Sequence, residues 1–133
     1  MEKLLNDLLL PEAQFWELPV FEVTNKHILI TGGSSGFGRH FARFLASNGA
    51  KVTLAARRAE ALASAVAEIN SCGGQGQSVV LDVTAAGKID LPLEQAEAKF
   101  GPIHAVINNA GVTATRPALE EDEPAWDSWL TPI

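Results

Sequence analysis

The stretch Lys26–Arg39, which reads KHILITGGSSGFGR, decides the fold of this chain. Its residues 28–30 are Ile-Leu-Ile, a composition typical of a buried β-strand. Four glycines follow between positions 32 and 38, and residues 39–47 then have the spacing of a helix. Because glycine has no side chain, such a turn lets backbone N–H groups approach a phosphate closely, and the helix N-terminus adds a partial positive charge. An ordinary tight turn could carry the same glycines, but the strand before it and the helix after it favour a phosphate-binding turn.

The spacing of the glycines is informative. Gly32, Gly36 and Gly38 fit T-G-x-x-x-G-x-G rather than the G-x-G-x-x-G of most dinucleotide-binding domains. A second motif, Asn108–Gly111 with the sequence NNAG, follows a later apolar run. In this order the two motifs resemble those of the short-chain dehydrogenase/reductase family, and the resemblance covers about 21–127. It implies an α/β fold, a Rossmann-type three-layer sandwich with a parallel sheet, and an NAD(P) cofactor.

Strand and helix patterns alternate along the chain. Right-handed crossovers would place four parallel strands in the order 3-2-1-4, so that strands one and four flank the point where such sheets bind ligands. The first helix has an apolar stripe of the kind by which a helix packs against a core. The members of this stripe are Phe37, Phe41, Phe44 and Leu45. We expect strands at 27–31, 51–56, 77–81 and 104–108, and helices at 39–47, 59–71 and from Pro92 to 100.

The residues after the second expected strand favour NADP over NAD. In dinucleotide-binding folds an acid near this point binds the ribose 2′-hydroxyl of NAD, whereas this chain has Arg57 and Arg58. A carboxylate would repel a 2′-phosphate, and a guanidinium can pair with it bidentately, with Arg57 the preferred contact. The alternative is two solvated arginines at a helix start, although the helix dipole disfavours positive charge there. Many NADP-preferring members of the family also carry a basic residue before the second glycine, where this chain has Ser35.

The third expected strand is followed by Asp82 and Val83. In the family a D-V pair at this point borders the adenine, although a plain turn could also place an aspartate here. We expect no metal site. The resemblance assigns NADP binding, with NAD the less favoured cofactor, to four segments of the chain. The residues are Gly32, Ser34, Ser35, Gly36, Phe37, Gly38, Arg57, Arg58, Asp82, Val83, Asn108, Asn109, Ala110 and Gly111.

The composition limits the classes of partner. The chain of 133 residues is at most one domain, and we expect a dinucleotide-binding domain at 21–133 after an N-terminal extension at 1–20. The formal net charge of −6 argues against nonspecific binding to nucleic acid or to an anionic membrane. No stretch approaches the ~20 apolar residues of a membrane span. Cys72 is the single cysteine, so no internal disulfide can form, and we expect a reducing, cytoplasmic location.

The N-terminal extension lies outside the family resemblance. It carries leucines between positions 4 and 10, interrupted by Asn6 and Asp7, and then Phe15 and Trp16. These residues could form a short amphipathic helix followed by an arm. The extension is then either loosely docked on the domain or an arm that binds a partner or another subunit.

The catalytic residues of the family have no counterpart in this chain. After Gly111 the match continues to Trp126–Asp127 and then decays from Ser128, whereas the catalytic serine and the Y-x-x-x-K pair of the family lie further on. The chain also contains no tyrosine. We therefore expect the truncated, cofactor-binding portion of an oxidoreductase that transfers hydride between NADP(H) and an alcohol or carbonyl, inactive alone.

In such a portion the sheet would be incomplete on the strand-four side, leaving an edge open to self-association or docking. The alternatives are a noncatalytic dinucleotide-binding or interaction module, and a nonfunctional truncated product.

Overall fold

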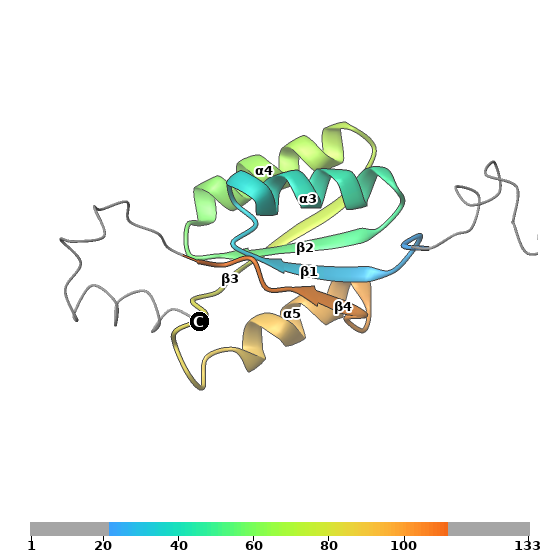
Figure 1. Cartoon of the computed structure of the whole chain (residues 1–133). Helices are drawn as coiled ribbons and strands as arrows, with labels where there is room; N and C mark the ends of the chain where they lie inside the picture. The colour runs from blue at the N-terminus through green and yellow to red at the C-terminus, as the bar shows by residue number, and fades with distance from the viewer. Residues whose placement is uncertain (1–21, 112–133) are drawn as a thin grey trace, which may run out of the picture.

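The computed structural model describes residues 22–111, which form a three-layer α/β sandwich (Figure 1). Its four-stranded sheet is parallel, with the order β3-β2-β1-β4. Helices α3 and α4 cover one face of the sheet and α5 covers the other (Figure 1). The fold class and strand order expected from the sequence are confirmed. The elements are β1 (His27–Thr31), α3 (Gly36–Ser47), β2 (Lys51–Ala56), α4 (Ala59–Ser71), β3 (Gln75–Val80), α5 (Asp90–Phe100) and β4 (Ala105–Ile107).

The register of the sheet brings the carboxyl ends of the strands to one edge. Thr31 at the end of β1 pairs with Ala55 near the end of β2, and Ile30 pairs with Ile107 at the end of β4. The glycine turn after β1 and the NNAG loop after β4 therefore leave neighbouring strands at the same level. In a parallel sheet whose strand order reverses here, this edge is where ligands bind.

Alternating side chains of the strands point to opposite faces of the sheet and pack in two hydrophobic cores. Ile28 and Ile30 of β1 face α3 and α4, where they join a cluster that includes Val52, Leu54 and Leu62. The residue between the two isoleucines, Leu29, faces the opposite way and packs in the cluster beneath α5. This alternation is what a strand buried on both faces requires, and it explains the continuous apolar run in the sequence.

The face that α3 buries differs from the predicted one. The helix buries its small residues Gly38, Ala42 and Ala46, which follow one another at steps of four. Of the predicted apolar stripe only Leu45 packs against the core. The phenylalanines are exposed, Phe37 at 77%, Phe44 at 62% and Phe41 at 41%.

The close approach of α3 to the strands explains this correction. A Cβ atom on Gly38 would lie 2.6 Å from the carbonyl oxygen of Gly32. A helix this close to the sheet has no room for aromatic side chains on its inner face. The hydrophobic spacing identified a helix correctly, and the packing distance decided which of its faces is inside.

Element boundaries differ from the expected ones by up to three residues. The helix α3 begins at Gly36, three residues before the expected start at residue 39. The helix α5 begins at Asp90 rather than at Pro92. Strand β3 spans Gln75–Val80 because Gln75 already pairs with Lys51 of β2. Strand β4 is shorter than expected, three residues long.

A row of hydrogen-bonded polar side chains, called the polar chain below, crosses the buried sheet. The side-chain amide of Gln77 donates to Thr53 Oγ1 at 2.8 Å, and Thr53 Oγ1 lies 2.7 Å from Nε2 of the fully buried His27. The other ring nitrogen of His27 lies 2.7 Å from the carbonyl oxygen of Gly101, which can only accept, so Nδ1 donates this hydrogen bond. Gln77 also donates to the carbonyl oxygen of Ala96 in α5. The polar chain thus connects β1, β2 and β3 to α5 through hydrogen bonds. His27 has the structural role expected for it.

The predictions for the N-terminal extension with Phe15 and Trp16, and for the segment with Trp126–Asp127 and Ser128, fall outside the described residues. Within residues 22–111, no helix is both long and apolar enough to cross a membrane.

Candidate nucleotide-binding site

One open cavity of about 970 Å³ lies at the carboxyl edge of the sheet. Four segments that are far apart in the sequence line it: the glycine turn after β1, the β2–α4 connection, the residues after β3, and the loop after β4. The cavity therefore lies at the reversal of strand order, as the sequence motifs predicted. Its lining residues are Gly32, Ser34, Ser35, Gly36, Phe37, Ala55, Ala56, Arg57, Arg58, Leu81, Asp82, Val83, Thr84, Asn109, Ala110 and Gly111.

The glycine turn presents the N-terminus of α3 to this cavity. Ser35 is the N-cap residue, with an extended backbone (φ −156°), and its hydroxyl makes no capping hydrogen bond within the described residues. The first turn of α3 carries no acidic residue. Gly32 and Gly36 both have positive φ, +66° and +54°, which a side chain would strain. First-turn N–H groups and two serine hydroxyls are thus available for an anion at a helix N-terminus.

A hydrogen-bonded clamp fixes the NNAG loop against the glycine turn. The Thr31 hydroxyl accepts from the backbone N–H groups of Asn109 (3.1 Å) and Ala110 (3.0 Å), and it donates to the carbonyl oxygen of Ile107 (3.4 Å). All three hydrogen-bonding positions of this hydroxyl are used. The Asn109 amide in turn donates to the carbonyl oxygens of Thr31 (3.2 Å) and Gly32 (3.3 Å). The two motifs therefore form one rigid unit beside the cavity.

Two of the residues predicted at the cofactor do not line the cavity. Gly38 is buried in the first turn of α3, where a Cβ would lie 2.5 Å from the side-chain nitrogen of Asn109. It allows the helix to approach the clamp. Asn108 is exposed, directly after the end of β4, and is not among the residues that line the cavity. The remaining predicted residues all face the cavity.

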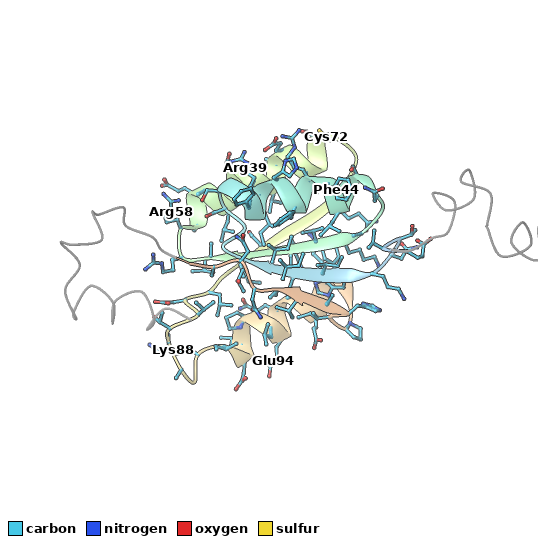
Figure 2. All side chains as sticks on the ribbon, in the orientation of Figure 1. Arg39, Phe44, Arg58, Cys72, Lys88 and Glu94 are labelled. Atoms are coloured by element: carbon cyan, nitrogen blue, oxygen red, sulfur yellow. The ribbon has the colours of Figure 1, made fainter. Side chains whose placement is uncertain are left out.

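The two arginines lie at the start of α4. Arg58 is the N-cap residue of α4, with φ −96° and ψ 103°, and Arg57 is the residue before it. Both side chains are exposed. A helix N-terminus disfavours a nearby guanidinium, and both arginines line the cavity. Figure 2 shows Arg58 at the carboxyl end of β2, the end of the sheet that holds the cavity.

Asp82, which follows β3, lines the same cavity as the two arginines. The hydroxyl (2.7 Å) and backbone N–H (3.0 Å) of Thr84 both donate to its Oδ1. These two hydrogen bonds are the main cause of a lowered pKa for Asp82, to which the charge of Arg57 also contributes. Asp82 is therefore an oriented carboxylate with Arg57 in electrostatic range.

Reasoning from the sequence missed several residues of the site. The Thr31 hydroxyl binds the backbone of Asn109, and Thr84 binds the carboxylate of Asp82. Ala55, Ala56 and Leu81 line the cavity. The pattern Asp82-x-Thr84 is a signal for an Asx-type turn that could have been found. The threonine before the first glycine was recognised only as part of a motif. Within residues 22–111 no group of three or more His, Cys, Asp or Glu side chains could hold a metal ion.

Comparisons with known proteins agree with this arrangement. The sequence profile described as short chain dehydrogenase matches residues 26–131. An uncharacterized oxidoreductase of Listeria monocytogenes is 39% identical over 110 residues, which cover 81% of this chain and 44% of the relative. Gluconate 5-dehydrogenase of Gluconobacter oxydans is 34% identical, with coverage of 84% and 44%.

Solved structures give the same result. A short-chain type dehydrogenase/reductase from Mycobacterium marinum superposes with a TM-score of 0.77 at 30% identity. The match covers 86% of this chain and 47% of that structure. The chain thus spans less than half the length of each of these three relatives.

Proposed function

Because this chain belongs to the short-chain dehydrogenase/reductase family, we propose that the cavity at the carboxyl edge of its sheet binds NADP(H). The chain then supplies the cofactor-binding part of an oxidoreductase that transfers hydride between NADP(H) and an alcohol or carbonyl substrate. The convergence of four separate segments on a single cavity carries this proposal.

Each segment offers the chemistry of one part of a dinucleotide. The N-terminus of α3, with Ser34 and Ser35 beside it, suits the pyrophosphate. Asp82 and Val83 line the cavity, and they are the D-V pair that in the family borders the adenine. The Asp82 carboxylate can accept a hydrogen bond from an amino group. The hydrogen bonds between Thr31 and Asn109 hold the NNAG loop against the end of β1, beside the glycine turn.

The preference for NADP rests on the charge at the end of β2. Arg57 and Arg58 line the cavity where NAD-binding folds carry an acid. Asp82 partly offsets the charge of Arg57, but Glu60, in the first turn of α4, does not line the cavity. Two guanidiniums facing a doubly charged 2′-phosphate therefore outweigh a single oriented carboxylate.

Isothermal titration of the full chain with NADP⁺ and NAD⁺ tests the preference. We expect NADP⁺ to bind about 10-fold more tightly, which corresponds to one charge-assisted hydrogen bond. The change Arg57→Ala should abolish most of that difference. The matched control is Arg43→Ala, because Arg43 is an exposed arginine that pairs with Glu68 and does not line this cavity. Equal affinities, or a preference that Arg57→Ala leaves intact, would contradict the proposal.

We further propose that residues 1–133 do not turn over substrate alone. The chain holds no tyrosine, the residue that in the family exchanges the hydroxyl proton. Absorbance of NADPH should therefore stay constant with a panel of ketones and secondary alcohols. Turnover by a preparation free of host dehydrogenases would refute this. Because the chain has one cysteine, we also place it in the reducing cytoplasm, which cell fractionation checks.

A second candidate function, a noncatalytic interaction module, is favoured by β4. This strand is an edge of the sheet among the described residues, and Val106 is 51% exposed. Exposed edges of apolar strands recruit other strands. We propose that the chain self-associates or docks on another chain through β4. Size-exclusion chromatography over a concentration series tests this, and a monomer at all concentrations would contradict self-association.

A further inference from the structure

The outer face of α3 carries an apolar stripe, of which only Phe37, in the first turn of the helix, also lines the nucleotide cavity. Phe37, Phe41 and Phe44 follow one another at steps of four and three, and all three are exposed. The rings of Phe37 and Phe41 stack at 6.3 Å between centroids with an interplanar angle of 22°. Single exposed apolar residues are ordinary, but a contiguous aromatic stripe marks an interaction surface.

A second cavity, of about 380 Å³, continues this stripe into the groove between α3 and α4. Phe44 and Ile69 supply apolar walls, and His40, Arg43 and Glu68 supply polar ones. Cys72, the exposed single thiol, lies in the same lining. Figure 2 shows Phe44 and Cys72 at the same end of the two helices, opposite Arg58. This groove is therefore separate from the nucleotide site.

We propose that the N-terminal segment of this same chain, residues 1–20, packs on the aromatic stripe of α3, with the Phe15–Trp16 pair at the α3–α4 groove. The segment has the apolar content to do so, because it carries six leucines together with Phe15 and Trp16.

The position at which the chain enters the domain supports this occupant. Just before β1, the backbone N–H of Asn25 donates to the carbonyl oxygen of Gly49 (2.8 Å), two residues beyond the end of α3. The described chain therefore enters the domain beside the carboxyl-terminal end of α3, the end that holds Phe44. Residue 22 lies six positions after Trp16, enough for ~20 Å of extended chain, and α3 itself is only ~18 Å long. The segment can reach the groove directly and then follow the stripe.

Charge complementarity supports the same occupant. Residues 1–20 contain four acidic residues and one lysine. The helix α3 contains Arg39, His40 and Arg43 and no acid. Glu68 of α4 already pairs with Arg39 (2.7 Å) and Arg43 (3.0 Å), yet among the described residues the Arg43 side chain stays 58% exposed. An acidic, apolar segment matches a basic, aromatic helix face.

Paramagnetic relaxation in the full chain tests the proposal. A nitroxide on Cys72, the single cysteine, broadens amide signals of nearby residues. We expect residues 12–18 to lose intensity, and the loss to disappear in the double variant Phe41→Ser/Phe44→Ser. Both side chains are exposed, so the variant should stay folded, and unchanged signals of β1 and β2 in the same spectrum verify this.

The matched control is Val106→Ser, which removes an exposed apolar side chain from β4 and should leave the broadening unchanged. Sharp signals from residues 12–18 in the labelled wild-type chain would overturn the proposal, as would broadening that Val106→Ser abolishes. Broadening of residues 112–133 instead would assign the face to the C-terminal segment and overturn it. In a mixture of spin-labelled chain and chain without the nitroxide, broadening of signals from the chain without the nitroxide would show that a second copy occupies this face. That result would also overturn the proposal.

Discussion

Replacing Gly38 by alanine separates the packing of α3 from its helix propensity. In an exposed helix interior this change would stabilise the protein by ~1 kcal/mol. Here the added Cβ would lie 2.5 Å from the Asn109 side-chain nitrogen and 2.6 Å from the carbonyl oxygen of Gly32. The amide can rotate away only by giving up its hydrogen bonds to the Thr31 and Gly32 carbonyl oxygens. The backbone oxygen cannot move without shifting the glycine turn.

These costs exceed the propensity gain. Overpacking costs roughly 1–3 kcal/mol, and each lost hydrogen bond costs roughly 0.5–1.5 kcal/mol. The net expectation for Gly38→Ala is a destabilisation of about 3 kcal/mol, together with weaker NADP⁺ binding, because the displaced turn forms the wall of the cavity.

Urea unfolding of the full chain, followed by circular dichroism, measures this loss. The control Ala63→Gly, at an exposed position inside α4, reports the propensity difference alone, and we expect it to destabilise the chain by ~1 kcal/mol. If Gly38→Ala instead raised the unfolding midpoint, the close contact between α3 and the clamp would be refuted.

Three further predictions concern the core, the sheet edge and the pH dependence. Thr53→Val should destabilise the chain by about 3 kcal/mol in urea unfolding, because the buried side chains of His27 and Gln77 both lose their hydrogen bond to the Thr53 hydroxyl. A loss of less than ~1 kcal/mol would contradict the role of the polar chain. Val106→Lys should lower the apparent mass in size-exclusion chromatography if β4 mediates self-association, whereas an unchanged elution volume would place the contact elsewhere. Asp82 has a lowered pKa, mainly through Thr84, so its contribution is present at neutral pH and is lost as the pH falls below about 4. The unfolding midpoint of the wild type should therefore drop more steeply between pH 6 and pH 3 than that of Asp82→Asn, and parallel curves would contradict the carboxylate's role.

The sequence predicted the sheet order because local patterns determine it. A run such as Ile28–Ile30 can only be a buried strand once a glycine turn and a helix follow it, and right-handed crossovers then restrict the topology. Motifs with a fixed place on the strands, such as Gly32 and Asn109, were therefore predicted on the same side of the sheet. The structure brings them to one cavity.

The sequence did not predict distances between elements. The apolar spacing of Phe37, Phe41 and Phe44 is that of a buried stripe, and no local rule says that α3 approaches the sheet too closely for it. The hydroxyl of Thr31 has its three partners only because β4 pairs with β1, which is a long-range contact. The packing distance thus explains why the predicted buried face of α3 was wrong. Long-range hydrogen bonds explain why the sequence did not reveal the role of Thr31.

An NMR titration of the ¹⁵N-labelled full chain with NADP⁺ tests the central claim most directly. We expect amide shifts in 32–37, 57–58, 82–84 and 109–111, with larger shifts at Arg57 for NADP⁺ than for NAD⁺, and none around Cys72 in the α3–α4 groove. Absence of shifts in the glycine turn and the NNAG loop at saturating nucleotide, or shifts centred on the groove, would contradict the assignment of the nucleotide site.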